Sequence, residues 1–297
     1  LYGTPALGTM AHAWVQMFDT EYDAFATYCK YYPQNAVLLV DTYNTLKSGI
    51  PNAIKAFNDV LKPLGIKKCG IRLDSGDLAY LSKEARKMLD AAGFTDAVIA
   101  ASNDLDELLI HDLKMQGAAI TSWGVGTNLI TSKDCPSFGG VYKLAAIKDR
   151  YTGKFIPKIK LSENTEKVTN PGNKTIQRIY DKETGKIIAD LICLVDEEFD
   201  EKNSLLLFDP IETWKKTHLA PGTYTMRELL VPIFKNGECV YESPKVMDIR
   251  EYCKKEQEAL WDESRRLVNP HEIHVDLSNE LWHMKAQLLD SYHYTSN

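Results

Sequence analysis

A guanidinium and a carboxylate lie two positions apart in the segment Arg72-Leu-Asp74, which ends an apolar run. Side chains two positions apart on a strand point to the same face of a sheet, so we expect the two groups to lie together. An arginine can bind phosphate through two parallel hydrogen bonds, and Asp74 could bind Mg²⁺ or stabilise positive charge on a sugar ring. The segment alone is equally compatible with a strand-end salt bridge followed by a helix cap at Ser75 or Asp77.

A glycine-containing segment, Trp123-Gly-Val-Gly-Thr127, could bind phosphate. Gly124 and Gly126 would let backbone amides approach an anion, the following helix would direct its positive end at it, and Thr127 would add a hydroxyl. The same residues also suit an ordinary tight turn. The segment follows the fourth apolar run of the chain, and the loops after late strands of (β/α)8 barrels often bind phosphate.

A histidine, His12, lies near the start of a predicted helix in the segment Gly8-Thr-Met-Ala-His12. The apolar residues Trp14, Val15 and Phe18 follow it at helical spacing. Composition alone favours a structural role, because histidine is common at helix starts. The remaining histidines do not have the spacing of metal ligands.

Short apolar runs alternate with helical patterns in the first half of the chain, and this rhythm predicts a parallel sheet covered by helices. The runs span residues 36–40, 69–73, 97–101 and 118–122, and helical patterns span 50–64 and 81–92. Polar or small residues, including Asp41, Asp74, Ser102 and Gly124, follow the runs. Ligands bind at the carboxyl ends of parallel strands, so the active site is predicted at this edge.

The pattern changes after residue 148 to β-type stretches separated by turn signals at 170–173, 181–185, 221–222 and 235–237. Two amphipathic helices are then predicted, at 246–267 and 278–289. We therefore expect a partial α/β barrel with the active-site residues at 1–148. Residues 149–297 would form a β-rich accessory region with C-terminal helices, part of which could complete the barrel domain.

The composition indicates a folded, soluble protein: 44% of the 297 residues are hydrophobic, 26% are charged, and the formal net charge is −6. Lysine and arginine are scattered, which argues against nucleic acid or an anionic membrane as a partner. No apolar run approaches the roughly 18–20 residues of a membrane helix. The six cysteines have no Cys-x-x-Cys spacing, so we interpret them as reduced core residues, which favours a cytoplasmic location.

Eight segments in order along the chain resemble the nicotinate phosphoribosyltransferase family, and the likeness runs from Gly3 to about Leu289. The segments are Gly8-Thr-Met-Ala-His12, Val40-Asp-Thr-Tyr43, Arg72-Leu-Asp-Ser-Gly-Asp77, Ala101-Ser-Asn-Asp104, Gly124-Val-Gly-Thr127, Lys160-Leu-Ser-Glu163, Thr169-Asn-Pro-Gly172 and Val275-Asp-Leu-Ser-Asn-Glu-Leu281. Their shared order and spacing make a chance likeness improbable.

The resemblance implies a type II phosphoribosyltransferase: an irregular (β/α) barrel with a β-rich accessory region, working as a homodimer. It implies ATP-assisted condensation of nicotinate with phosphoribosyl pyrophosphate, with Mg²⁺ as cofactor, in NAD biosynthesis. His12 matches the family's active-site histidine, which ATP phosphorylates; a positioned imidazole is a reasonable nucleophile toward phosphorus. The resemblance thus changes the interpretation of His12 from structural to catalytic.

The same resemblance implies roles for the other candidates. Arg72 should contact phosphate, and Asp41 and Asp74 should support Mg²⁺ or the cationic ribosyl centre. The residues expected to hold substrate and its phosphates are Thr9, Asp41, Ser102, Asn103, Gly124, Gly126 and Thr127.

The sequence departs from the family at its start. The family has an N-terminal domain and early barrel strands before the histidine segment, whereas this chain opens at Leu1 in an apolar stretch. We therefore expect a C-terminal portion whose missing part includes the aromatic residue that stacks on the pyridine ring. A chain of this length could lack activity.

Three alternatives remain open. A related enzyme that uses nicotinamide is disfavoured because its arginine segment resembles this one but has proline in place of Leu73 and asparagine in place of Asp77. A barrel that only binds a phosphorylated nucleotide is disfavoured by the presence of His12, Arg72 and Asp74. An unrelated aldolase-like barrel would need a lysine at a strand end, and only Lys143 follows a later apolar stretch.

Overall fold

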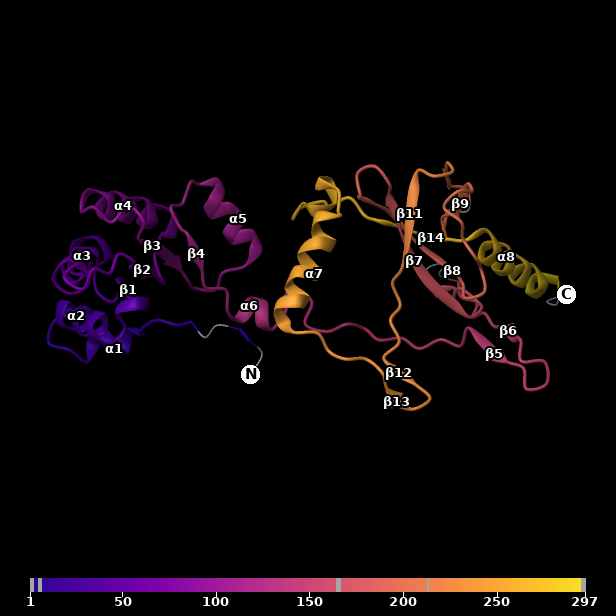
Figure 1. The fold of residues 1–297 in the computed structure, drawn as a ribbon, viewed down its shortest axis with the longest axis horizontal. Coiled ribbons are helices and arrows are strands. Elements are labelled where there is room, and N and C mark those ends of the chain that lie inside the picture. Colours follow the sequence, from indigo (N-terminus) through magenta and orange to yellow (C-terminus); the bar gives the residue numbers. More distant parts are fainter. Residues whose placement is uncertain (1–2, 5–6, 164–166, 213, 295–297) are drawn as a thin grey trace. The chain divides into compact units, whose positions relative to one another are not determined.

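The chain folds as two units in the computed structural model (Figure 1). The structure describes residues 3–4, 7–163, 167–212 and 214–294. One unit comprises Pro5–Gly139, and the other comprises Gly140–Asn297 with Leu1–Thr4. This division lies at 139/140, whereas the change of sequence pattern lies at 148/149.

The first unit is built on a four-stranded parallel sheet. Its strands, in the order β1-β2-β3-β4, are β1 Val37–Leu39, β2 Gly70–Leu73, β3 Val98–Ala101 and β4 Ser122–Trp123. The first three confirm the predicted runs. The fold is mixed α/β, and a closed barrel is not confirmed: among the described residues, β1 and β4 form the edges of this sheet.

The fourth predicted strand is wrong over residues 118–121, because pairing with β3 begins only at Ser122. Thr121 explains the late start. Its hydroxyl accepts the Ile99 N–H at 3.1 Å, in the place where a backbone carbonyl would continue the ladder, while the Thr121 N–H donates to the Ile99 carbonyl at 2.9 Å. A side chain therefore ends the sheet at this point.

Helices follow the strands of the first unit as the apolar spacing predicts. They are α1 His12–Gln16, α2 Glu21–Tyr31, α3 Ile50–Ala56, α4 Leu78–Ala91, α5 Glu107–Met115 and α6 Thr127–Ile130. A short 3₁₀ turn, η1, spans Pro33–Asn35, and two π-helical segments, η2 Thr45–Gly49 and η3 Phe57–Leu61, directly precede and follow α3. Asp77 caps α4 by accepting the Tyr80 N–H at 2.9 Å. A Cβ at Gly49 would lie 1.8 Å from the Val40 carbonyl oxygen, so η2 can approach the end of β1 only because residue 49 is glycine.

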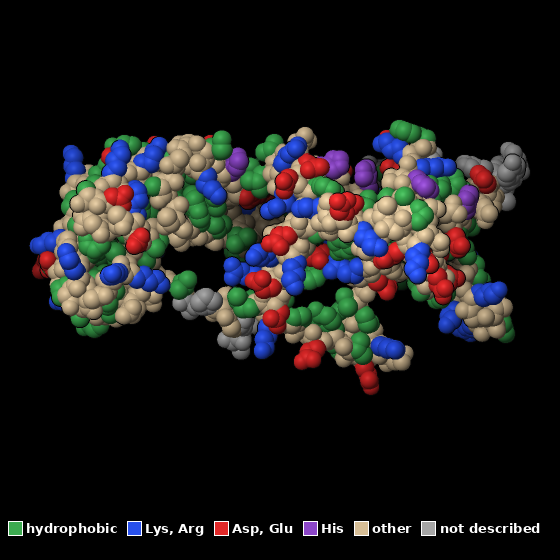
Figure 2. Space-filling view, turned by 45° about the horizontal axis from the view of Figure 1, so that its top comes forward, with side chains coloured by type: hydrophobic (Ala, Val, Ile, Leu, Met, Phe, Trp, Pro, Cys, Tyr) green, Lys and Arg blue, Asp and Glu red, His purple; other side chains and the backbone are tan. Residues whose placement is uncertain are grey.

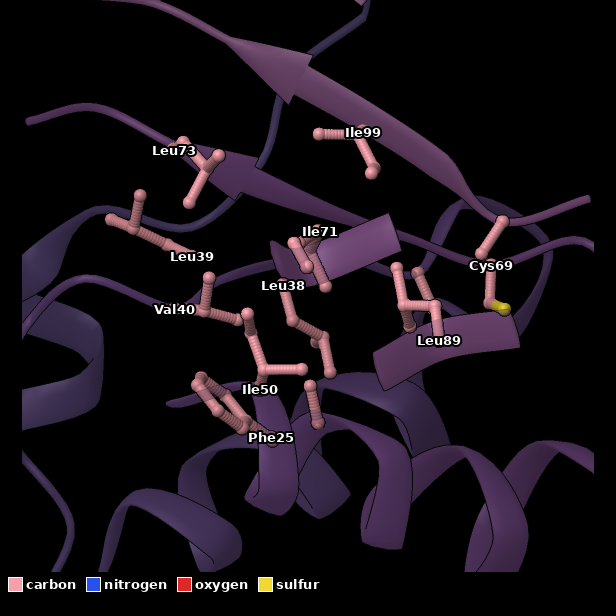
Figure 3. Close-up of a cluster of buried hydrophobic side chains, with 14 of the residues drawn as sticks. Phe25, Leu38, Leu39, Val40, Ile50, Cys69, Ile71, Leu73, Leu89 and Ile99 are labelled. Atoms are coloured by element: carbon pink, nitrogen blue, oxygen red, sulfur yellow. The ribbon is translucent and has the colours of Figure 1, made fainter. Parts of the chain in front are cut away.

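Alternation along the strands divides the sheet into two faces. Leu38, Ile71 and Ile99 are paired neighbours on one face and are fully buried. Figure 3 shows them directed at helical side chains such as Ile50 and Leu89, which are also fully buried. On the other face, Leu39 is also buried, but its neighbours Arg72 and Ala100 are only partly buried.

The second unit contains a six-stranded, mostly antiparallel sheet in the order β10-β9-β14-β8-β7-β11. The strands are β7 Lys174–Asp181, β8 Ile187–Leu194, β9 Leu205–Phe208, β10 Lys216–Leu219, β11 Tyr224–Glu228 and β14 His274–Leu277. Two small hairpins, β5 Ala146–Lys148 with β6 Phe155–Pro157 and β12 Phe234–Lys235 with β13 Glu238–Cys239, complete the described strands. The turns predicted at 181–185, 221–222 and 235–237 each lie between consecutive strands, as expected.

The helix predicted at 246–267 ends early. Helix α7 spans Val246–Glu258 and a separate turn, η5, spans Asp262–Arg265. Trp261 lies between them in an extended conformation, and its indole N–H donates to the Ile187 carbonyl at 2.7 Å. This contact with β8 fixes the break. The last predicted helix is confirmed as α8 Asn279–Tyr294.

An ion-pair network joins α7 to the second sheet. Arg178 on β7 donates to both carboxylate oxygens of Asp190 on β8, each at 2.8 Å, and to Glu256 on α7 at 3.1 Å. Arg227 on β11 donates to the same Glu256 oxygen at 2.8 Å. The hydrogen-bonded carboxylate of Asp190 raises the pKa of the Arg178 guanidinium above its usual value. The network therefore connects three strands and a helix.

The prediction that the six cysteines are reduced core residues is confirmed only in part. All six cysteines are free thiols, and Cys29, Cys69 and Cys193 are buried as predicted. The prediction of core positions is wrong for Cys135, Cys239 and Cys253, which are exposed.

None of the described helices is long and apolar enough to cross a membrane. On the face drawn in Figure 2, positive and negative side chains are intermixed.

Candidate active site

The ends of β1, β2 and β3 are connected by hydrogen bonds between polar residues that the sequence singled out. Asp41 Oδ2 accepts the Asp74 backbone N–H at 2.9 Å and the Ser75 hydroxyl at 2.6 Å. The Ser102 hydroxyl donates to Asp74 Oδ1. The parallel sheet thus brings together side chains from residues 41 to 102, as its topology requires.

His12, the first residue of α1, faces this group. Its Nδ1 lies 3.0 Å from the Thr42 hydroxyl. Its Nε2 lies 3.9 Å from Asp41 Oδ1 and 3.8 Å from Asp74 Oδ2. The imidazole side chain is 40% exposed, so a ligand in solvent can reach it.

The carboxylate of Asp41 is buried without full compensation. Its side chain is only 2% exposed, and Oδ1 has no hydrogen-bond partner among the described residues. Buried carboxylates are normally paired or bound to a metal, because an uncompensated buried charge is costly. The polar atom described near Oδ1 is Nε2 of His12, at a distance longer than a hydrogen bond. The arrangement leaves an acceptor ready for a cationic group.

Arg72 lies on the face of the sheet opposite the packed core. Its Nη1 donates to the Thr9 hydroxyl at 2.5 Å, and its Nη2 lies 3.9 Å from Asp74 Oδ1. The Nε atom is buried without a hydrogen-bond partner among the described residues. Thr9 also lines a cleft of about 510 Å³ with Tyr28, Ala100 and other residues of this unit. The guanidinium therefore has donor capacity beside a cleft.

Each charged or titratable side chain of the site is held by a hydroxyl group. We call the set the strand-end cluster; it consists of His12 with Thr42, Asp41 with Ser75, Arg72 with Thr9, and Asp74 with Ser102. Sequence reasoning did not assign site roles to Thr42 and Ser75. The available signal was position, since each directly follows an aspartate at a strand end.

The glycine-containing loop is less closely connected. The Gly124 N–H donates to the Ala101 carbonyl at 2.8 Å, and a Cβ at Gly124 would lie 3.4 Å from the Ser102 Cβ, so Gly124 adjoins the cluster. Asn103 has a φ of 97°, a conformation uncommon outside glycine. Within the described part of the chain, no hydrogen bond connects Asn103, Gly126 or Thr127 to the strand-end cluster.

A metal ion would have two carboxylates at this site. Among the described residues, no group of three or more histidine, cysteine or acidic side chains is arranged to hold a metal ion. Mg²⁺ is commonly bound through one or two carboxylates, with water and substrate phosphates as its other ligands. Asp41 Oδ1, which lacks a partner among the residues that the structure describes, and the accessible Asp74 fit that donor set.

Comparison with known proteins gives a consistent result. A family model described as the nicotinate phosphoribosyltransferase C-terminal domain matches residues 173–285. A nicotinate phosphoribosyltransferase of Bacillus subtilis (strain 168) is 46% identical over 288 residues, covering 96% of this chain and 57% of the relative. One of Dictyostelium discoideum is 37% identical over 280 residues, covering 89% of this chain and 46% of the relative. The chain thus spans about half the length of these relatives.

The fold is similar to that of a solved structure. A crystal structure of human nicotinic acid phosphoribosyltransferase matches 97% of this chain and 62% of its own chain, with a TM-score of 0.71 and 24% identity. Fold and cluster together define an α/β protein with charged groups at the carboxyl edge of a parallel sheet. The matches to the two relatives, which cover 96% and 89% of this chain, are more specific. The chain is thus similar to nicotinate phosphoribosyltransferases over almost its whole length, and its residues 173–285 match the C-terminal domain of that family.

Proposed function

We propose that this protein catalyses the ATP-assisted condensation of nicotinate with phosphoribosyl pyrophosphate, giving nicotinate mononucleotide and pyrophosphate. The observation that carries the proposal is the buried Oδ1 of Asp41, which lies beside His12 and Asp74 and has no hydrogen-bond partner in the described part of the chain. An acceptor kept free of protein partners suits a site in which positive charge arrives with the ligand or develops during reaction. The family's named activity supplies the substrates.

The carboxylates would act at the sugar. Departure of pyrophosphate leaves positive charge at the anomeric carbon, which the pyridine nitrogen attacks. Asp41 and Asp74 would stabilise that charge electrostatically, and Ser75 and Ser102 hold them in place. If Mg²⁺ binds, the same two carboxylates would hold it, and the ion would neutralise phosphate charge.

The donors around the carboxylates would hold the anionic parts of the substrates. Arg72 would bind phosphate with the donor capacity that Thr9 and Asp74 leave unused. Gly124 lies next to Ser102, and because it has no side chain it would let a phosphate approach the backbone closely. Asn103, Gly126 and Thr127 would contact the phosphates from the adjoining loops, which are exposed.

His12 would accept a phosphoryl group from ATP. A lone pair of its imidazole attacks the terminal phosphorus, the bond to the bridging oxygen breaks, and ADP leaves. Later hydrolysis of this phosphohistidine would drive the condensation. The exposure of the ring and its two carboxylate neighbours support this role.

Finer features of the family are also proposals for this chain. We propose that the four-stranded sheet is part of an irregular barrel, that the protein works as a homodimer, and that it functions in the cytoplasm. We likewise propose a barrel portion at 1–148 and a β-rich accessory region with C-terminal helices at 149–297. Sedimentation velocity of the purified chain would test the dimer.

The activity is tested directly. After intact mass measurement, the chain is incubated with nicotinate, phosphoribosyl pyrophosphate, Mg²⁺ and ATP, and nicotinate mononucleotide is measured; nicotinamide replaces nicotinate in a parallel assay. We expect nicotinate mononucleotide in the assay with nicotinate and no mononucleotide in the assay with nicotinamide. Product from nicotinamide alone, or no product from either base, would contradict the proposal.

The role of His12 is tested by His12→Ala. We expect this variant to lose ATP hydrolysis and the stimulation by ATP, while some transfer continues, because binding and electrostatic stabilisation do not require the imidazole. Equal ATP hydrolysis by the variant and the parent would refute the role.

A further inference from the structure

The two ring nitrogens of His12 have different neighbours. Nδ1 lies 3.0 Å from the Thr42 hydroxyl, which is within hydrogen-bond distance. Nε2 lies 3.8–3.9 Å from one oxygen of Asp74 and one of Asp41. A hydroxyl therefore holds one side of the ring while the other side faces negative charge.

The backbone around His12 does not determine this orientation. Helix α1 has five residues, and no described side chain makes a capping hydrogen bond to its first turn. The χ2 torsion of histidine is broad and roughly two-fold, so a half-exposed ring can flip at little cost. A flip would put Cδ2 against Thr42 and move Nε2 away from the carboxylates. Among the described residues, the only side-chain hydrogen bond of His12 is the one to Thr42.

Thr42 is itself firmly placed. It follows Asp41, whose Oδ2 is tied to the end of β2 by the Asp74 N–H and the Ser75 hydroxyl. Threonine is β-branched, which restricts its χ1 torsion. The hydroxyl that reaches Nδ1 is therefore carried by a fixed backbone and a stiff side chain.

We infer that Thr42 is the positioning residue of His12: its hydroxyl holds Nδ1 and so keeps Nε2 directed at Asp41 and Asp74. This inference rests on the proposed role of His12 as phosphoryl acceptor. A ring held in one orientation presents its reactive nitrogen to ATP in one geometry. The reaction is then faster, because less orientational freedom must be lost to reach the transition state.

Thr42→Val tests the inference because it removes the hydroxyl and keeps the side-chain volume. We expect the ratio of ATP-supported to ATP-free mononucleotide formation to fall about tenfold, equivalent to about 1.4 kcal/mol. Acid-labile phosphate on His12 should fall in parallel. Thr42→Ser restores the hydroxyl and should recover most of the ratio. Thr45→Val is the matched control: Thr45 is half-buried, and in the described structure its side chain does not hydrogen-bond the cluster.

A spectroscopic measurement tests the contact without catalysis. The ring nitrogens of His12 are identified in ¹⁵N NMR spectra as the resonances lost in His12→Asn. The Nδ1 resonance should move in Thr42→Val and stay in place in Thr45→Val and Thr42→Ser.

The possible outcomes separate the two proposals. An inactive, unphosphorylated parent whose Nδ1 resonance still responds to Thr42→Val would contradict the proposed function and leave the positioning contact supported. An active parent with an unchanged ratio in Thr42→Val, or with Thr42→Ser as impaired as Thr42→Val, would overturn the positioning role. An Nδ1 resonance that ignores Thr42→Val would also overturn it.

Discussion

Arginine meets carboxylates in both units, but in different ways. In the second unit Arg178 donates to both oxygens of Asp190 at 2.8 Å, and Glu256 accepts from two arginines. In the strand-end cluster Arg72 Nη2 lies 3.9 Å from Asp74 Oδ1, and both Arg72 and Asp41 retain buried atoms without partners in the described structure.

The difference shows how one kind of chemistry serves two purposes. Paired charges in the second unit join strands and helix at low cost, although the Nε of Arg227 is unpartnered among the described residues there as well. In the strand-end cluster, hydroxyl groups fix the side chains without neutralising them. Groups kept apart in this way destabilise the fold but remain available to a ligand.

The largest effect should come from neutralising the unpaired carboxylate. Asp41→Asn retains an oxygen that can accept from Asp74 and Ser75 but removes the negative charge. We expect kcat to fall about 100-fold, in the range for loss of one stabilising group in an active site, with unchanged or higher resistance to urea. Steady-state kinetics and urea denaturation measure both. A variant that is less stable yet fully active would contradict the comparison, because Asp41 would then serve the fold, as the ion-pair network does, and not the reaction.

Breaking the ion-pair network of the second unit should instead lower the stability of the fold. Arg178→Ala leaves Asp190, whose side chain is 16% exposed, without its guanidinium partner. We expect the free energy of unfolding to fall by about 2–3 kcal/mol, somewhat below the cost at a fully buried pair. Chemical denaturation measures the change. The control is Arg265→Ala, because its pair with Asp262 is largely exposed and should contribute under about 1 kcal/mol.

Arg72 differs from Arg178 in having donor capacity to spare. Arg72→Ala should raise the apparent KM for phosphoribosyl pyrophosphate about tenfold, because a charge-assisted contact contributes about 1.5–3 kcal/mol. Its effect on urea stability should be smaller than that of Arg178→Ala. Donor titrations with parent and variant provide the measurement, and equal KM values would refute phosphate binding by Arg72.

The smallest effect concerns a carboxyl group in the second unit whose partners are a hydroxyl and a backbone amide, with no cationic partner among the described residues. Glu197 accepts from the Leu194 N–H at 2.7 Å and the Ser278 hydroxyl at 2.6 Å, and burial raises its pKa. Compared with the unfolded chain, the folded state therefore shifts the equilibrium of Glu197 toward its protonated form. Its contribution to stability is complete below the unfolded pKa of about 4.3 and is lost as pH rises through the folded pKa. Glu197→Gln should flatten this part of the stability–pH curve, and an unchanged slope would contradict the assignment.

The sequence predicted the residues of the site better than their connections. Strand-end positions identified Asp41, Asp74 and Ser102, because parallel topology brings such positions together. Which hydroxyl meets which charge depends on side-chain directions fixed only by packing. Ser102, expected to bind phosphate, donates to Asp74, and Thr42 was passed over although it meets His12.

Elements were predicted where periodicity is local and missed where a distant contact decides. The runs at β1, β2 and β3 alternate with helices as their spacing indicates. The start of β4 depends on the Thr121 hydroxyl, and the end of α7 depends on a contact between Trp261 and β8. Neither hydrogen bond can be predicted from the residue pattern of the segment, because each depends on a residue that is distant in sequence.

One feature of the second sheet bears on how the chain matures on the ribosome. Strand β14 pairs with β8 on one side and β9 on the other, although its residues, His274–Leu277, follow those strands by many positions. During synthesis, β8 and β9 emerge well before the strand that separates them. Until it arrives, each has an open edge that can pair with another nascent chain. The late insertion of β14 therefore makes the interval between the synthesis of β9 and that of β14 the period when this unit most needs protection from aggregation.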